Sequence, residues 1–140
     1  MSRINAKAVA LGFLLTIALD TLLGIGLLMM HSDEVTVTGR SAEQVSQDLA
    51  AVTGSPSFLL FSIIFGSLTT MAGGFVAVRL AKKHYPYFNG FAVGVLGAAF
   101  GLLFWGDNPL WFNLFALVTV IPMALLGAHL AVRSVAPRDQ

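Results

Sequence analysis

The segment Leu11–Met30 reads LGFLLTIALDTLLGIGLLMM, and Asp20 is the single charged side chain in it. About 20 mainly apolar residues are enough for an α-helix to span the hydrocarbon core of a bilayer. Asp20 falls near the middle of such a helix, where a charge costs at least ~2.5–3.5 kcal/mol. We therefore expect Asp20 to face protein or water inside a helical bundle rather than lipid.

The rest of the chain is also apolar. Hydrophobic residues make up 56% of the 140 residues and charged residues only 11%, which argues against a soluble domain. A segment that crosses lipid must satisfy its own backbone hydrogen bonds, so long apolar runs are expected to be helical. The sequence predicts an all-α membrane protein, a single domain over residues 1–140 with four transmembrane helices. These are expected at Ala8–Met30, Ser57–Leu80, Phe88–Trp105 and Leu110–Val132.

The basic residues are distributed unevenly between the loops. Seven of the eight flank the predicted spans on one side of the membrane, and Arg40 in the first connection is the exception. Loops rich in Lys and Arg stay in the cytoplasm. We therefore expect both termini to be cytoplasmic, residues 31–55 to form an extracytoplasmic loop, and the membrane to be a bacterial inner membrane. The seven residues are Arg3, Lys7, Arg79, Lys82, Lys83, Arg133 and Arg138.

The loop 31–55 carries its own secondary-structure signals. Glu34–Thr38 alternates polar and apolar residues, as a short extended segment does. Ser41 followed by Gln44 forms the pattern of a helix capping box. Apolar residues then recur at helical spacing, at Val45, Leu49 and Val52. A short amphipathic helix near 42–52 is predicted, lying on the outer membrane surface or over the bundle, with a solvated loop as the alternative.

Depth in the membrane can be counted along each span at ~1.5 Å per residue. Asp20 is twelve residues from Ala8, or ~18 Å, and the same distance along the other spans reaches about Leu68, Phe100 and Val120. Polar and small side chains gather near this depth, which suits an inward-facing carboxyl group. The predicted intramembrane polar site comprises Asp20, Thr16, Thr69, Thr70 and Thr119, the last three being the expected hydrogen-bond partners of Asp20.

Glycines recur along the predicted spans, often four residues apart. Small residues at this spacing allow membrane helices to approach closely. The contacts could lie within one chain or between copies, and both remain open. The predicted helix-packing residues are Gly12, Gly24, Gly66, Gly74, Gly90, Gly94, Gly97 and Gly101.

Few residues could carry enzyme chemistry. The chain has no cysteine, and we find no nucleophile–base pair, no metal-ligand spacing and no glycine loop beside a lysine. We therefore expect no enzymatic activity, no cofactor and no metal. The net charge of +1 gives no indication of nucleic-acid binding.

Two non-enzymatic functions remain. The sequence favours the first, an accessory or scaffold subunit of a larger membrane complex, whose partners are the bilayer and other membrane subunits or further copies of the chain. The second is a small proton- or cation-coupled transporter that uses Asp20. Four short spans with an acid in the middle of the first resemble the small multidrug resistance exporters, and this resemblance implies proton-coupled transport. The chain departs from those exporters in its long connection 31–55 and in its uneven charge distribution.

A second resemblance involves Met71–Ala81 and Asn89–Gly97. These two stretches are similar to a glycine-rich hairpin in small four-span bacterial proteins of unknown function. The resemblance implies a bacterial membrane protein and no particular activity.

Overall fold

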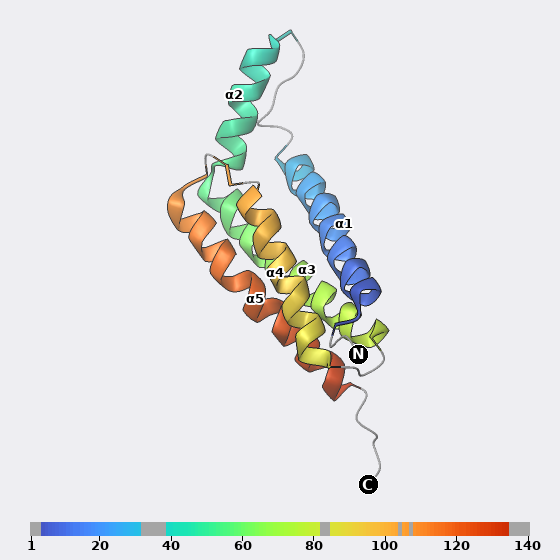
Figure 1. Cartoon of the computed structure of the whole chain (residues 1–140). Coiled ribbons are helices and arrows are strands. Elements are labelled where there is room, and N and C mark those ends of the chain that lie inside the picture. Colours follow the sequence, from blue (N-terminus) through green and yellow to red (C-terminus); the bar gives the residue numbers. More distant parts are fainter. Residues whose placement is uncertain (1–3, 32–38, 82–84, 104, 107, 135–140) are drawn as a thin grey trace.

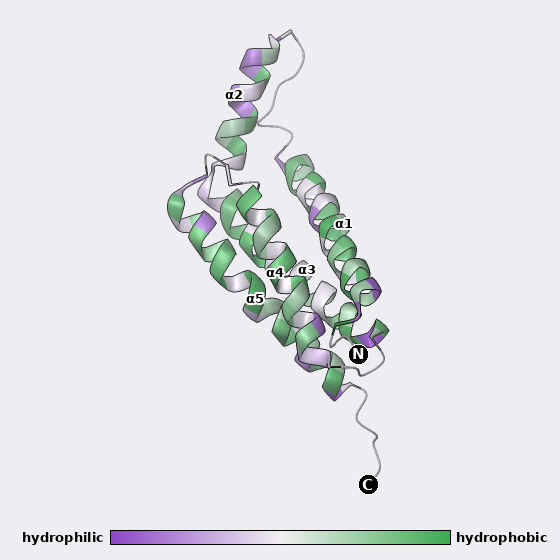
Figure 2. Cartoon of the chain, in the orientation of Figure 1, coloured by the Kyte–Doolittle hydropathy of each residue, from purple (hydrophilic) through white to green (hydrophobic). Residues whose placement is uncertain are grey.

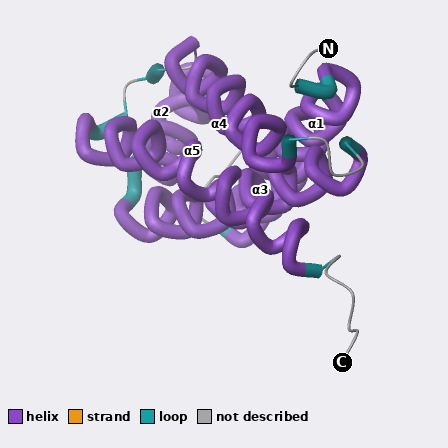
Figure 3. The backbone as a smooth tube through the Cα atoms, turned by 60° about the horizontal axis from the view of Figure 1, so that its bottom comes forward, coloured by secondary structure: helices purple, strands orange, loops and turns teal. Residues whose placement is uncertain are grey.

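The computed structural model describes residues 4–31, 39–81, 85–103, 105–106 and 108–134. In these ranges the chain forms five α-helices and no strand. Figures 1 and 3 show how the helices are arranged. The helices are α1 (Ala6–Met30), α2 (Ala42–Thr53), α3 (Pro56–Leu80), α4 (Pro86–Leu103) and α5 (Leu110–Arg133). The prediction of an all-helical fold is confirmed, whereas the segment Glu34–Thr38 lies outside the described residues.

Four of these helices, α1, α3, α4 and α5, are long and apolar enough to cross a membrane. Only 22–28% of the most apolar stretch of each is buried inside the structure, and Figure 2 shows green, hydrophobic residues over most of their length. A monomeric soluble protein rarely exposes apolar surface on this scale. The structure is therefore consistent with a multi-pass membrane protein, as predicted.

Capping residues determine where the helices begin. The Asn5 side chain accepts a hydrogen bond from the Ala8 amide, 3.1 Å away, so α1 begins at Ala6 rather than at Ala8. Ser55 caps α3 in the same way, and Pro56 occupies its first turn, where a missing N–H is tolerated. Pro86 likewise begins α4, two residues before the start predicted from hydropathy. Hydropathy does not detect capping residues or prolines, so these helices begin one or two residues before the starts predicted from their apolar runs.

Successive spans run in opposite directions, so α1 begins and α5 ends at one end of the bundle (Figure 1). We call this the inner end, and the opposite end, with α2 and the α4–α5 connection, the outer end. Helix α3 packs against both α1 and α5, and α4 packs mainly against α5. Two aromatic pairs lie at opposite ends: Tyr85 and Tyr87 at the start of α4, and Trp105 and Trp111 around the α4–α5 connection. All four are exposed, as interfacial aromatic residues of membrane proteins are.

Glycines bring the helices together in the inner half of the bundle. A Cβ atom on Gly12 would lie 2.5 Å from the Gly73 carbonyl oxygen, and one on Gly90 would lie 2.5 Å from the Ala128 Cβ. At Gly127 a Cβ would overlap the Met71 carbonyl. Such approaches of one backbone to another are a main source of packing energy between membrane helices.

Helix α1 also contacts α4 in this half of the bundle. The Asn5 amide donates a hydrogen bond to Asn89 Oδ1 at 2.8 Å, and the fully buried Asn89 side chain donates to the Tyr85 carbonyl at 3.0 Å. Farther along, the rings of Phe13 and Phe100 meet edge to face, with centroids 5.8 Å apart. These contacts hold the first half of α1 against the bundle.

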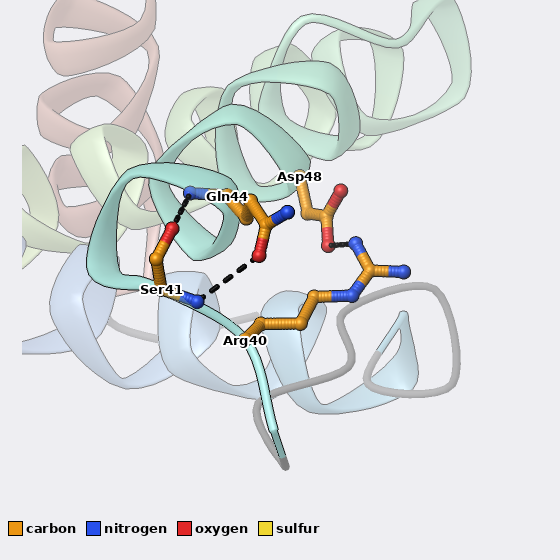
Figure 4. Close-up of polar contacts among 4 residues, drawn as sticks. All are labelled: Arg40, Ser41, Gln44 and Asp48. Atoms are coloured by element: carbon orange, nitrogen blue, oxygen red, sulfur yellow. Dashed lines mark hydrogen bonds and ion pairs between the residues drawn. The ribbon is translucent and has the colours of Figure 1, made fainter.

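Helix α2 projects from the outer end of the bundle (Figure 1). Its N-terminus has a capping box, in which the Ser41 side chain accepts from the Gln44 backbone amide and the Gln44 side chain accepts from the Ser41 backbone amide (Figure 4). Arg40 forms an ion pair with Asp48 at 2.5 Å. The apolar residues of α2 differ in burial: Val52 is 4% exposed, whereas Leu49 is 38% exposed. The helix therefore contacts the bundle near its C-terminal end.

Candidate functional site

Asp20 is bound by a threonine of the neighbouring helix α3. Thr69 Oγ1 donates a hydrogen bond to Asp20 Oδ1, and the same hydroxyl lies 2.9 Å from the Gly66 carbonyl oxygen. Thr69 is buried, whereas Asp20 is exposed. The sequence named Thr69 as one of three expected partners, and the structure places it in contact with Asp20.

The position of Thr69 Oγ1 suits both protonation states of Asp20. A hydroxyl group has one proton to donate and two lone pairs that accept. When Asp20 is ionised, Thr69 can donate its proton to the carboxylate. When Asp20 is protonated, the acid can donate to Thr69 Oγ1, which then donates to the Gly66 carbonyl. The Thr69 hydroxyl therefore has a hydrogen-bond acceptor in both protonation states of Asp20.

The other predicted threonines occupy different positions. Thr16 Oγ1 donates to the Gly12 carbonyl at 3.1 Å and lies 3.5 Å from the Thr69 carbonyl oxygen, within the contact between α1 and α3. Thr119 Oγ1 donates to the Phe115 carbonyl of its own helix at 2.8 Å. Thr70 is buried. Of these three, Thr70 and Thr119 line a cavity that Asp20 also lines, and Thr16 does not.

This cavity has a volume of about 260 Å³ and lies between α3, α4 and α5, with Asp20 contributed by α1. Most of its polar lining is made of hydroxyl and amide side chains, and Asp20 is the only charged residue among the described residues that line it. A cavity of this size and polarity can hold several waters or one small ligand. The polar residues that line it are Asp20, Ser62, Ser67, Thr70, Asn108, Asn113 and Thr119.

The predicted glycines divide into two groups. Gly12, Gly74, Gly90, Gly94 and Gly97 each lie against a neighbouring helix of the same chain. A Cβ atom would have no atom of another helix within 4 Å at the remaining three, Gly24, Gly66 and Gly101. Gly66 and Gly101 instead line the cavity. The open glycines lie toward the outer end, where the helices separate and leave room for the cavity.

Four polar residues that line the cavity were not among the predicted site residues: Ser62, Ser67, Asn108 and Asn113. Asn113 Nδ2 donates to the Asn108 carbonyl at 3.3 Å, which ties the start of α5 to the α4–α5 connection. Each asparagine lies within three residues of an exposed tryptophan, Trp105 or Trp111. Ser62 lies four residues before Gly66 and eight before Thr70, and this shared helical face is the signal that could have identified it.

Pro122 and His129 lie outside the cavity. Helix α5 runs through Pro122 without interruption. His129 Nδ1 lies 3.0 Å from the Tyr87 hydroxyl, near the inner end. Neither residue lines the cavity around Asp20. No cluster of three or more potential metal-binding side chains occurs in the part of the chain that the structure describes.

Comparisons with protein-family models, curated proteins and solved structures find no match for this chain.

Proposed function

We propose that the chain is a small, non-enzymatic membrane carrier that exchanges a small cation for a proton at Asp20. The observation that carries this proposal is the cavity of about 260 Å³, whose mainly apolar lining includes hydroxyl and amide side chains and which reaches an intramembrane carboxyl group. No Lys, Arg or His occurs among the described residues that line this cavity, so its only formal charge is the negative charge of ionised Asp20.

Exchange follows from the cost of an unpaired charge at this depth. An empty site is more stable with Asp20 protonated, because an unpaired carboxylate in the membrane is costly. A bound cation favours the ionised acid, because opposite charges stabilise each other. Proton and cation therefore compete for one group. The hydrogen bond from Thr69 is available to the carboxylate, and the Gly66 carbonyl accepts from Thr69 when Asp20 is neutral.

The orientation of the chain is also part of this proposal. Lys7, Arg79 and Arg133 lie at the inner end of the bundle. The uneven distribution of basic residues favours a cytoplasmic position for this end, and we propose that the cell is bacterial. Residues 31–55, including α2, and the α4–α5 connection then lie outside the cytoplasm.

The carrier activity can be measured in proteoliposomes that contain a trapped pH-sensitive dye. Na⁺, K⁺ or tetramethylammonium chloride is added outside, with protein-free liposomes as the control. We expect at least one of these cations to drive protons out and to raise the internal pH several-fold faster than in the control. If none of the three changes the internal pH, the carrier proposal is wrong.

A second candidate is an accessory subunit of a larger membrane complex, and the outer half of α1 favours it. Leu22, Met29 and Met30 are 66%, 71% and 80% exposed, and Gly24 and Gly26 have open space around them. A helix of another membrane protein, or of a second copy, could approach this face closely.

Purification from native membranes in a gentle detergent separates the two candidates. The accessory role predicts that larger membrane subunits purify with the chain in fixed stoichiometry. The carrier role predicts the chain alone or bound only to copies of itself. Fixed stoichiometry with larger subunits, together with no proton movement in the liposome assay, would favour the accessory role.

A further inference from the structure

We infer that the cavity is a cation-selective vestibule that connects Asp20 to the outer end of the bundle and is closed toward the inner end. This inference rests on the proposed role of Asp20 and adds the route by which the cation reaches it. It is carried by the positions of the lining residues along three helices and by the packing beyond them.

The lining residues mark a path along the helix axes. On α5 they run from Phe112 to Val120, and on α3 from Ser62 to Thr70. Eight residues of helix correspond to ~12 Å. The cavity therefore extends from the outer end to the middle of the bundle, where it meets Asp20.

The outer end of this path reaches the surface. Trp105 and Asn108, in the segment that joins α4 to α5, line the cavity and are both exposed. Asn113 holds the start of α5 to this segment through the Asn108 carbonyl and the Gly106 carbonyl, at 3.3 and 3.4 Å. The entrance thus consists of aromatic and amide side chains, without a formal charge among the described residues.

The inner end of the path is closed by backbone contacts. A Cβ on Gly94 would lie 2.9 Å from the Ile121 Cα, and one on Gly74 would overlap the Ala124 carbonyl. Ala77, one turn farther along α3, and Ala124 are 0% exposed. Beyond Thr70 and Val120 the helices are therefore in contact, and the structure shows the vestibule in a state open to the outer end.

The charge distribution favours cations over anions. The walls are mainly apolar, with hydroxyl and amide side chains among them, and the one carboxyl group among the described lining residues lies beside Thr69 at the inner limit of the path. When Asp20 is ionised, the low-dielectric walls of the cavity focus the field of its carboxylate and raise the local concentration of cations. The same field repels anions.

Cysteine accessibility tests this inference directly, because the chain has no native cysteine. Ser67→Cys places a thiol in the cavity wall, and Ser46→Cys and Ser134→Cys provide exposed controls on α2 and at the end of α5. Each variant is treated in intact cells and in inverted membrane vesicles with two impermeant methanethiosulfonates, one carrying a trimethylammonium group and one a sulfonate group.

We expect Ser67→Cys to react from the same side as Ser46→Cys, which the proposed orientation places outside the cell. The reactions are followed over a series of increasing pH values. Once Asp20 is ionised, the ratio of the cationic to the anionic reaction rate should be about tenfold higher at Ser67→Cys than at Ser46→Cys. Adding Asp20→Asn should bring this ratio close to that of Ser46→Cys.

The opposing outcomes are distinct. Reaction of Ser67→Cys only from the side of Ser134→Cys, or from neither side, would overturn the route. Equal ratios at Ser67→Cys and Ser46→Cys at every pH would overturn the cation preference. If the vestibule behaves as expected but no cation moves protons in liposomes, the carrier proposal fails while the vestibule stands.

Discussion

Gly127→Ala should destabilise the bundle by about 1–3 kcal/mol, the usual cost of overpacking a well-packed site. A Cβ at Gly127 would overlap the Met71 carbonyl and lie 2.9 Å from the Phe75 backbone nitrogen. Both neighbours are backbone atoms of α3 and cannot rotate away. Helices α3 and α5 would have to separate, which would also weaken the adjacent contact between Gly74 and Ala124.

Gly26→Ala is the matched control, because a Cβ atom on Gly26 would have no atom of another helix within 4 Å. Substitutions at such open positions usually change stability by no more than about 0.5 kcal/mol. Thermal unfolding of the purified protein in detergent, followed by circular dichroism, measures both variants. A lower unfolding temperature for Gly127→Ala alone supports the packing described here. Equal shifts for the two variants would mean that α3 and α5 do not approach as closely as the structure shows.

The spans and the neighbourhood of Asp20 could be predicted from the sequence because helix geometry is regular. A constant rise per residue converts position into depth, and this was enough to place Thr69 and Thr70 level with Asp20. The hydrophobic runs also located the ends of the four long helices to within two residues. The shifts at the starts of α1 and α4 occur at Asn5 and at Pro86, where caps and prolines extend the helix beyond its apolar run.

Other features depend on tertiary packing and could not be read from spacing. Gly12 and Gly24 lie in one four-residue series, yet Gly12 contacts Gly73 and Gly24 has no other helix within reach, because the helices separate toward the outer end. Thr119 lies at the expected depth, but its hydroxyl is satisfied by a carbonyl of its own helix. Threonine in a helix often makes this local bond, so depth alone does not identify a partner.

Replacing Asp20 tests the role of the carboxyl group. The substitution Asp20→Asn keeps the size of the side chain, and the new amide can accept from Thr69 or donate to it, but it cannot exchange a proton. The variant should therefore fold with an unfolding temperature close to that of the wild type. Asp20→Glu retains a titratable carboxyl group at the edge of the cavity and should preserve part of the exchange.

The most direct measurement is the rate of proton movement in proteoliposomes containing wild-type protein, Asp20→Asn or Asp20→Glu at equal density. We predict that the wild type exchanges protons for an added cation, that Asp20→Glu retains measurable exchange, and that Asp20→Asn falls to the rate of protein-free liposomes. Exchange by Asp20→Asn at the wild-type rate would contradict the account, because the carboxyl group of Asp20 would then have no part in transport.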